Sequence, residues 1–208
     1  MADKIVEFMR ALIGNDVVTT CIVSALPLVE LRYAIPLGIK MGVDPIIAFL
    51  LSYLGASLVC PILFFILRPV LNLMKKMKWF YNLATSVEQI FEEKSASIAE
   101  KSAGETGAKA NKIKFWGVLL FVAIPLPLTG VWTGTAIAVF LNMKPRHAIP
   151  AVVLGNLIAA SIILALSVFF APYIDVILNA FLIIVVVVLI TWIVKLVLKT
   201  RKNSKQKN

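Results

Sequence analysis

The chain has 208 residues, of which 60% are hydrophobic and only 15% are charged. With a mean hydropathy of +0.93, this composition excludes an ordinary soluble domain and indicates one compact integral membrane domain. The formal net charge is +10, but the basic residues flank apolar runs, where the positive-inside rule explains them. We therefore expect no nucleic-acid partner.

An amphipathic N-terminal helix is predicted over residues 3–13, because the apolar residues recur on one helical face. It either lies in the membrane interface or forms an ordered cap. The first apolar segment, 17–39, is interrupted by two charged residues, Glu30 and Arg32. The next one, 45–67, carries no charge and is long enough to cross a core of roughly 30 Å, and we expect Arg68 and Pro69 to end it.

Residues 72–114 differ in composition, since they hold eight lysines and five glutamates. A capping box from Thr85 to Glu88 predicts the start of a surface helix over 86–102. The glycine-rich stretch 104–112 is then expected to be a flexible linker.

Three further apolar segments follow, over residues 115–143, 148–174 and 176–194. The first of these is broken by Pro125, Pro127 and Gly130, since proline removes a backbone donor. The C-terminal tail carries six basic residues and no acid.

The second half of the chain resembles the first at a fixed shift of 100 residues. Pro27 falls on Pro127, Pro45 on Pro145 and Gly55 on Gly155, among six identities over positions 27–56. The shift predicts a duplicated unit, a proline-broken segment followed by an uninterrupted span. The predicted order is an amphipathic N-terminal helix (1–16), repeat 1 (17–71), a cytoplasmic linker helix (72–114), repeat 2 (115–172), a last transmembrane helix (173–198) and a basic tail (199–208).

Loop charge predicts the topology of these segments. The 72–114 stretch and the tail are the most basic parts, so both should be cytoplasmic. Three apolar segments lie between them, so one must enter and leave on the same side. We therefore predict an all-α membrane protein, built as an inverted repeat of a proline-broken re-entrant hairpin plus a transmembrane helix, with one extra C-terminal transmembrane helix. The alternative is five ordinary kinked spans.

The candidate site lies where the two hairpin tips would meet. An ionisable residue at membrane depth costs roughly 2.5–3.5 kcal/mol and is functional by default. The alternative is that the two charges only neutralise each other and satisfy broken backbone. Direct pairing would need irregular backbone, because residues two apart do not share a helix face. The candidate substrate- or ion-binding residues are Glu30, Arg32, Tyr33, Thr129, Gly130, Trp132 and Thr133, and the candidate hairpin breaks are Pro27, Pro36, Pro125, Pro127 and Gly134.

Other chemistry has little support. With two cysteines and one histidine, the chain lacks the roughly four ligands of a structural zinc site, so no metal is expected. No nucleophile elbow, phosphate loop or cofactor fingerprint occurs. We expect neither an enzyme nor a cofactor, with an intramembrane enzyme left open.

Two motifs resemble the signatures of a known family. Glu30-Leu-Arg32-Tyr-Ala-Ile-Pro36 resembles E-L-R-x-A-I-P, and Pro125-Leu-Pro127-Leu-Thr129-Gly130-Val-Trp132-Thr-Gly134 resembles P-x-P-x-T-G-x-W-x-G, both of the bacterial and archaeal small multi-drug export proteins. That family domain would cover residues 20–170. The layout is also similar to that of the DedA membrane proteins, which are implicated in moving polyprenyl-phosphate lipid carriers, but the second hairpin here lacks their basic residues.

The resemblance implies a transporter of the cell (inner) membrane, with a cytoplasmic C-terminal tail. We predict ion- or proton-coupled export of small, amphiphilic, cationic, drug-like molecules. The alternatives are a translocase of polyprenyl-phosphate-type lipid carriers and a non-transporting membrane scaffold. The expected partners are membrane lipids and a small-molecule or lipid substrate, and a homodimer is left open.

Overall fold

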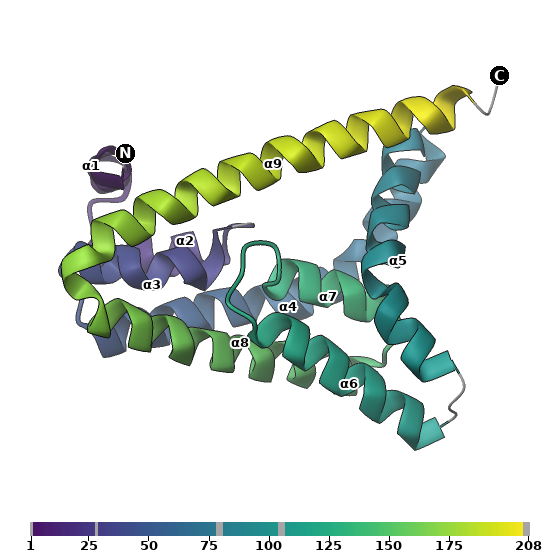
Figure 1. Cartoon of the computed structure of the whole chain (residues 1–208), viewed down its shortest axis with the longest axis horizontal. Helices are drawn as coiled ribbons and strands as arrows, with labels where there is room; N and C mark the ends of the chain where they lie inside the picture. Colours follow the sequence, from purple (N-terminus) through teal and green to yellow (C-terminus); the bar gives the residue numbers. More distant parts are fainter. Residues whose placement is uncertain (1, 28, 78–80, 104–106, 206–208) are drawn as a thin grey trace.

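The computed structural model describes residues 2–27, 29–77, 81–103 and 107–205, and within these ranges the chain forms helices and no strand. Figure 1 shows their arrangement. The helices are α1 (Ala2–Ile13), α2 (Asp16–Ala25), α3 (Glu30–Lys40), α4 (Pro45–Lys76), α5 (Tyr81–Ala103), α6 (Gly107–Ala123), α7 (Val131–Phe140), α8 (Pro145–Phe169) and α9 (Ile174–Lys205), with a 3-10 turn at Ala171–Tyr173.

Three described helices are long and apolar enough to cross a membrane: Pro45–Lys76, Pro145–Phe169 and Ala171–Thr191. They correspond to the three uninterrupted spans predicted from the sequence. Many large apolar side chains on these helices are exposed, as expected for surfaces that face lipid. The chain is therefore an all-helical membrane protein.

The predicted end of the second apolar segment at Arg68 and Pro69 is wrong. Helix α4 continues through Pro61 and Pro69 to Lys76. A proline removes one backbone hydrogen bond, whereas a broken helix in lipid would leave several backbone groups without partners. The helix is therefore the better solution even with two prolines inside it.

Other helix boundaries also differ from the predictions. Helix α5 begins at Tyr81, and the Thr85 hydroxyl donates to the Tyr81 carbonyl inside it, so Thr85 is no capping residue. Residues 107–112 of the predicted flexible linker belong to α6, and α9 continues to Lys205, into the predicted basic tail. The N-terminal helix over 3–13 is confirmed by α1.

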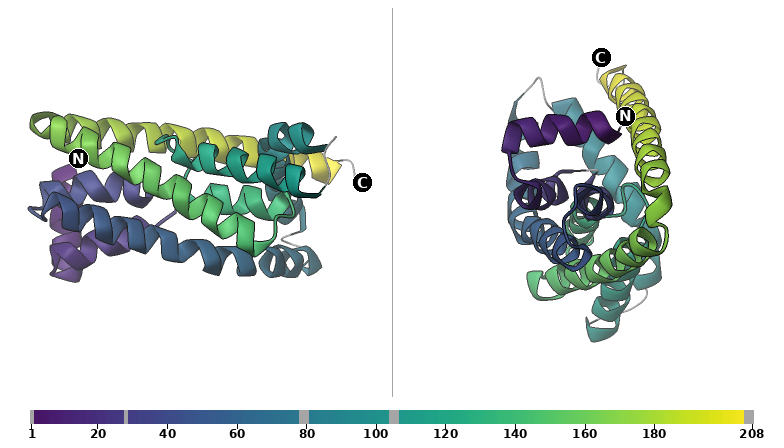
Figure 2. Two further views of the ribbon diagram at one scale, coloured as in Figure 1. Left: turned by 90° about the horizontal axis from the view of Figure 1, so that it is seen from below. Right: turned by 90° about the vertical axis from the view of Figure 1, so that its left-hand side faces the viewer.

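Two helical hairpins lie between the long helices. Helices α2 and α3 pack together and are joined at residues 26–29, and α6 and α7 pack together and are joined at 124–130. Both connections lie near the middle of the molecule's long axis, and the hairpins open toward opposite ends (Figures 1 and 2). Helices α4 and α8 pack against each other and against both hairpins, while α9 packs against α3 and α5.

The short helices α3 and α7 end in the same way, at positions 100 residues apart. In each, three successive residues at the end donate backbone hydrogen bonds back into the helix, and the middle residue, Gly42 or Asn142, has a left-handed φ of 90° or 53°. The bonds are Met41 N to Leu37 O, Gly42 N to Ile39 O and Val43 N to Gly38 O, and Leu141 N to Ile137 O, Asn142 N to Val139 O and Met143 N to Ala138 O.

Candidate functional site

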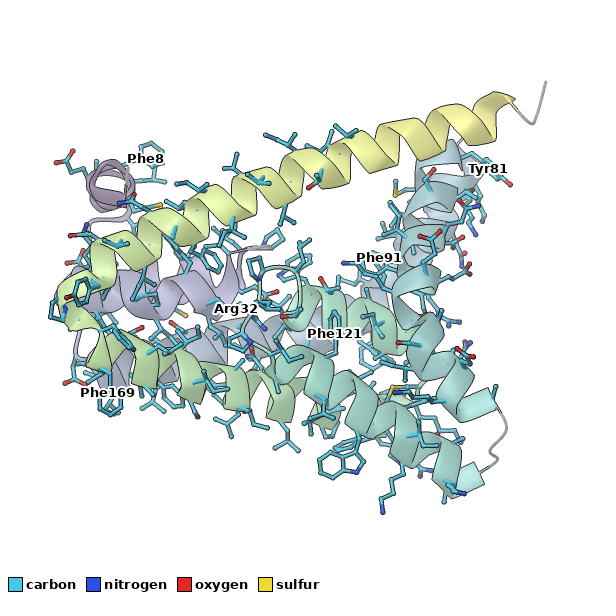
Figure 3. The ribbon with its side chains drawn as sticks, in the orientation of Figure 1. Phe8, Arg32, Tyr81, Phe91, Phe121 and Phe169 are labelled. Carbon is cyan, nitrogen blue, oxygen red and sulfur yellow. The ribbon has the colours of Figure 1, made fainter. Side chains whose placement is uncertain are left out.

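Glu30 and Arg32 form an ion pair in the first turn of α3. The Arg32 Nη1 donates to the Glu30 Oε2 at 2.9 Å, and the two side chains are only 1% and 5% exposed, Arg32 first. Glu30 has a left-handed φ of 49°, which costs a non-glycine residue about 1–2 kcal/mol. This is the irregular backbone that pairing across two positions requires. Figure 3 shows Arg32 in the middle of the helical assembly.

The Glu30 carboxylate also binds the start of α7. It accepts hydrogen bonds from the backbone N–H groups of Val131, at 3.1 Å, and Trp132, at 3.2 Å. A helix N-terminus has unpaired N–H groups and a positive dipole end, both of which favour an anion. The anion at this helix N-terminus is a carboxylate of the opposite hairpin.

Arg32 binds the end of α6 and the connection that follows it. Its Nη2 donates to the carbonyls of Val122, at 3.0 Å, and Ile124, at 3.2 Å, and to the Thr129 Oγ1 at 3.3 Å. These carbonyls lie where the helix breaks and have lost their intrahelical partners. The two charges therefore neutralise each other and satisfy broken backbone, as the alternative interpretation required, and they join the two tips.

Gly130 makes the close approach of Glu30 possible. A Cβ atom at this position would overlap the Glu30 carboxylate. Gly130 caps α7 in extended backbone, which any residue can adopt. Glycine is therefore needed at this position because it has no side chain. The shift of 100 residues that aligned Gly130 with Glu30 thus aligned two residues in direct contact.

The other predicted site residues divide between the tips and a separate buried cluster. The Trp132 Nε1 donates to the Ala25 carbonyl at 3.1 Å, which ties α7 to the end of α2. Thr133 is buried beside Trp132 in the same cavity wall. Tyr33 lies apart from them, because its ring packs against Phe181 of α9 with centroids 5.9 Å apart.

The candidate hairpin breaks are only partly correct. Helix α2 ends at Ala25 and α3 begins at Glu30, with Pro27 between them, and both Pro125 and Pro127 lie between α6 and α7. Pro36 lies inside α3 and Gly134 inside α7, so neither is a break. At Gly134 a Cβ would overlap the Val122 side chain, so this glycine permits close packing of α7 on α6.

Two cavities flank the ion pair. One, of about 290 Å³, is lined by Glu30, Trp132 and Thr133 together with apolar side chains of α4, α5, α7 and α9. The other, of about 330 Å³, is lined by Arg32 and by residues of α3, α8 and α9. Each member of the pair therefore borders a different cavity. The sequence did not predict that α9 contributes to the cavity wall, because Val188 and Leu189 have the same chemistry as side chains that face lipid.

No metal site accompanies the pair. Across the described ranges, no group of three or more histidine, cysteine, aspartate or glutamate residues could hold a metal ion.

Three long apolar helices around two hairpins, with a buried ion pair between the hairpin tips, define a small polytopic membrane protein. The family comparison agrees with this class. Residues 30–162, well over half of the chain, match the family described as "Putative small multi-drug export protein". The chain belongs to this family, as its two motifs indicated. No curated protein and no solved structure matched the chain.

Proposed function

We propose that this protein is a small inner-membrane transporter that exports amphiphilic molecules carrying a positive charge. The observation that carries the proposal is the buried Glu30–Arg32 pair, bordered by one cavity on the Glu30 side and another on the Arg32 side. Membership of an export-protein family supports the same class of activity.

The cavity beside Glu30 offers the groups that such a molecule needs. Its wall is largely apolar and includes the Trp132 ring as well as the carboxylate. The positive charge of such a molecule is attracted to a carboxylate and to the face of an indole ring, and its apolar part is buried against the apolar wall. The bound cation would compete with Arg32 for Glu30. Lys94 also lines this cavity. Because like charges repel, the positive charge of the bound molecule should lie near Glu30 and away from Lys94.

The architecture supports an inverted repeat with re-entrant hairpins. The hairpins open toward opposite ends of the molecule (Figure 1), and α3 and α7 share their C-terminal hydrogen bonds. Helix α5 and the C-terminal end of α9 lie at one end of the molecule, which we assign to the cytoplasm because of their Lys and Arg content. Rocking of one hairpin against the other would then expose Glu30 to each side in turn, with a proton or another ion bound to Glu30 as the coupling species.

The test is transport in proteoliposomes, with and without a pH gradient. We expect a cationic amphiphilic dye to move through the wild-type protein and through the Glu100→Gln control, which removes an exposed acid on α5. Glu30→Gln should abolish this movement. Equal dye transport by folded Glu30→Gln would overturn the proposal.

A second candidate function is translocation of polyprenyl-phosphate-type lipid carriers. It is favoured by the second cavity, where Arg32 is buried and its Nε has no hydrogen-bond partner within the described part of the chain. A guanidinium with free donors suits a phosphate. A short polyprenyl phosphate offered in parallel decides between the two, because this function predicts lipid movement that is lost in Arg32→Gln. Movement of neither compound would favour the membrane scaffold.

A further inference from the structure

A basic groove lies where α6 and α8 begin, far along the chain from Glu30 and Arg32. Its volume is about 460 Å³, and it is lined by Gly107, Ala108, Asn111, Lys112, Phe115, Arg146 and His147. None of these described lining residues is acidic. Lys112 and Arg146 are both exposed, and neither side chain forms a hydrogen bond or an ion pair with another residue that the structure describes.

The groove presents further groups that favour an anion. Gly107 and Ala108 lie in the first turn of α6, and Arg146 and His147 lie in the first turn of α8, so the N-terminal ends of two helices, which carry the positive end of the helix dipole, border the groove. The His147 Nδ1 is buried and has no hydrogen-bond partner among the residues that the structure describes. A buried polar atom without a partner is unusual, and a bound polar group would satisfy it.

Apolar stripes lead away from both cationic side chains. On α6, Trp116 and Leu120 follow Lys112 at four-residue spacing, and Ile124 continues this spacing directly after the helix ends; the three residues are 50%, 58% and 49% exposed. On α8, Pro150, Leu154 and Ile158 follow Arg146 at the same spacing and are likewise exposed. Residues four apart lie on the same side of a helix, and α6 and α8 pack side by side from the same end (Figure 1).

We propose that this groove binds the phosphate headgroup of an anionic phospholipid, with its two acyl chains along the apolar stripes of α6 and α8. The order of charged and apolar side chains along the groove matches the order of headgroup and acyl chains in a phospholipid. Lys112 and Arg146 meet the phosphate at the level of the headgroups, and exposed apolar side chains follow at the depth of the acyl chains. A soluble phosphate would use the basic end alone and would leave the stripes without a role.

The test compares lipids by native mass spectrometry and thermal unfolding of the full chain in detergent. Phosphatidylglycerol should be retained and should raise the unfolding temperature, while zwitterionic phosphatidylcholine should do neither. The Lys112→Gln/Arg146→Gln double variant should bind phosphatidylglycerol at least about tenfold more weakly, because two charge-assisted hydrogen bonds are lost. Added salt should weaken wild-type binding, because both cationic side chains are exposed and are screened by ions.

A matched control keeps the total charge change the same. Lys76→Gln/Lys101→Gln removes two exposed lysines from α4 and α5, outside the groove, and should bind phosphatidylglycerol as the wild type does. Equal weakening in both double variants would mean general attraction to the basic surface and would overturn the proposal. Equal stabilisation by inorganic phosphate and by phosphatidylglycerol would also overturn it, by showing a soluble-anion site. None of these readouts requires transport.

Discussion

Glu30 and Arg32 each bind backbone groups of the other hairpin, in addition to binding each other. Each charge therefore has several partners that would be left buried and unpaired if the other side chain were lost. Taking a charge out of water has a large desolvation free energy, which the charge-assisted hydrogen bonds of this arrangement offset. The pair thus contributes to the fold as well as forming the candidate transport site.

The first prediction concerns this pair. Glu30→Gln or Arg32→Gln alone should lower the free energy of unfolding by roughly 3–5 kcal/mol, since each leaves an uncompensated buried charge. The double variant should lose clearly less than the sum of the two. Chemical unfolding in detergent measures this double-mutant cycle, with Glu100→Gln as the exposed control. Additive losses would contradict a direct interaction.

The second prediction concerns Gly130. Gly130→Ala should separate the hairpin tips, because the new methyl group occupies the space of the Glu30 carboxylate. Overpacking of this kind costs about 1–3 kcal/mol or more. Gly117→Ala is the control, because its methyl group would lie 2.9 Å from the Ile98 side chain and not inside a buried carboxylate. A thermal unfolding comparison should show the larger loss for Gly130→Ala, and the reverse order would argue against the described tip contact.

The helical elements show why proline position alone does not predict a break. Pro27, Pro125 and Pro127 lie in the connections between helices, whereas Pro36, Pro61 and Pro69 lie inside helices. In the connection between α6 and α7, side chains form hydrogen bonds with backbone groups that have lost their helical partners. Arg32 and Thr129, for example, both donate to the carbonyl of Ile124. At this connection the helix breaks where polar side chains replace the lost hydrogen bonds, and one of them, Arg32, comes from a distant part of the sequence.

The third prediction concerns Gly55 and Gly155, which lie at the α2–α4 and α6–α8 crossings. A Cβ at Gly55 would overlap the Ser24 hydroxyl, and a Cβ at Gly155 would lie 2.5 Å from the Leu119 carbonyl. Either substitution to alanine should destabilise the protein. Ser24→Ala should partly rescue Gly55→Ala, because the closest obstruction is then removed. Unfolding of the three variants in detergent tests this, and a Gly155→Ala protein as stable as the wild type would contradict the described crossing.

At the scale of the whole molecule, α9 is the long apolar helix that lies outside the two similar halves. It lines both cavities and packs against α3 and α5. An ion pair between Lys40 and Asp175 joins its first turn to the end of α3. Helix α9 thus closes one side of the assembly, which the two halves would otherwise leave open to lipid.

The fourth prediction concerns topology. In a variant without Cys21 and Cys60, single cysteines at Ser97 and Ser204 should react with a membrane-impermeant thiol reagent from the cytoplasmic side. A cysteine at Ala171, which is exposed at the turn between α8 and α9, should react only from the other side. Labelling in intact and in opened cells separates the two faces. Accessibility of Ser97 and Ser204 from opposite sides would favour five ordinary spans.

The sequence by itself determined the membrane class, the three long spans, the two places where the helix breaks, and the intramembrane charges Glu30 and Arg32. These features depend on local composition and spacing, which act wherever the chain folds. The duplicated pattern also placed Gly130 opposite Glu30 by alignment alone, and the topology that it predicts awaits the labelling experiment.

Only the tertiary structure decided what those charges bind. The partners of Glu30 and Arg32 at Val131, Trp132, Val122 and Ile124 are backbone groups, and every residue carries such groups whatever its side chain. A sequence pattern therefore cannot single them out. The cavities depend in the same way on how α9 packs over both halves, because an apolar side chain facing lipid and one facing a cavity have the same chemistry.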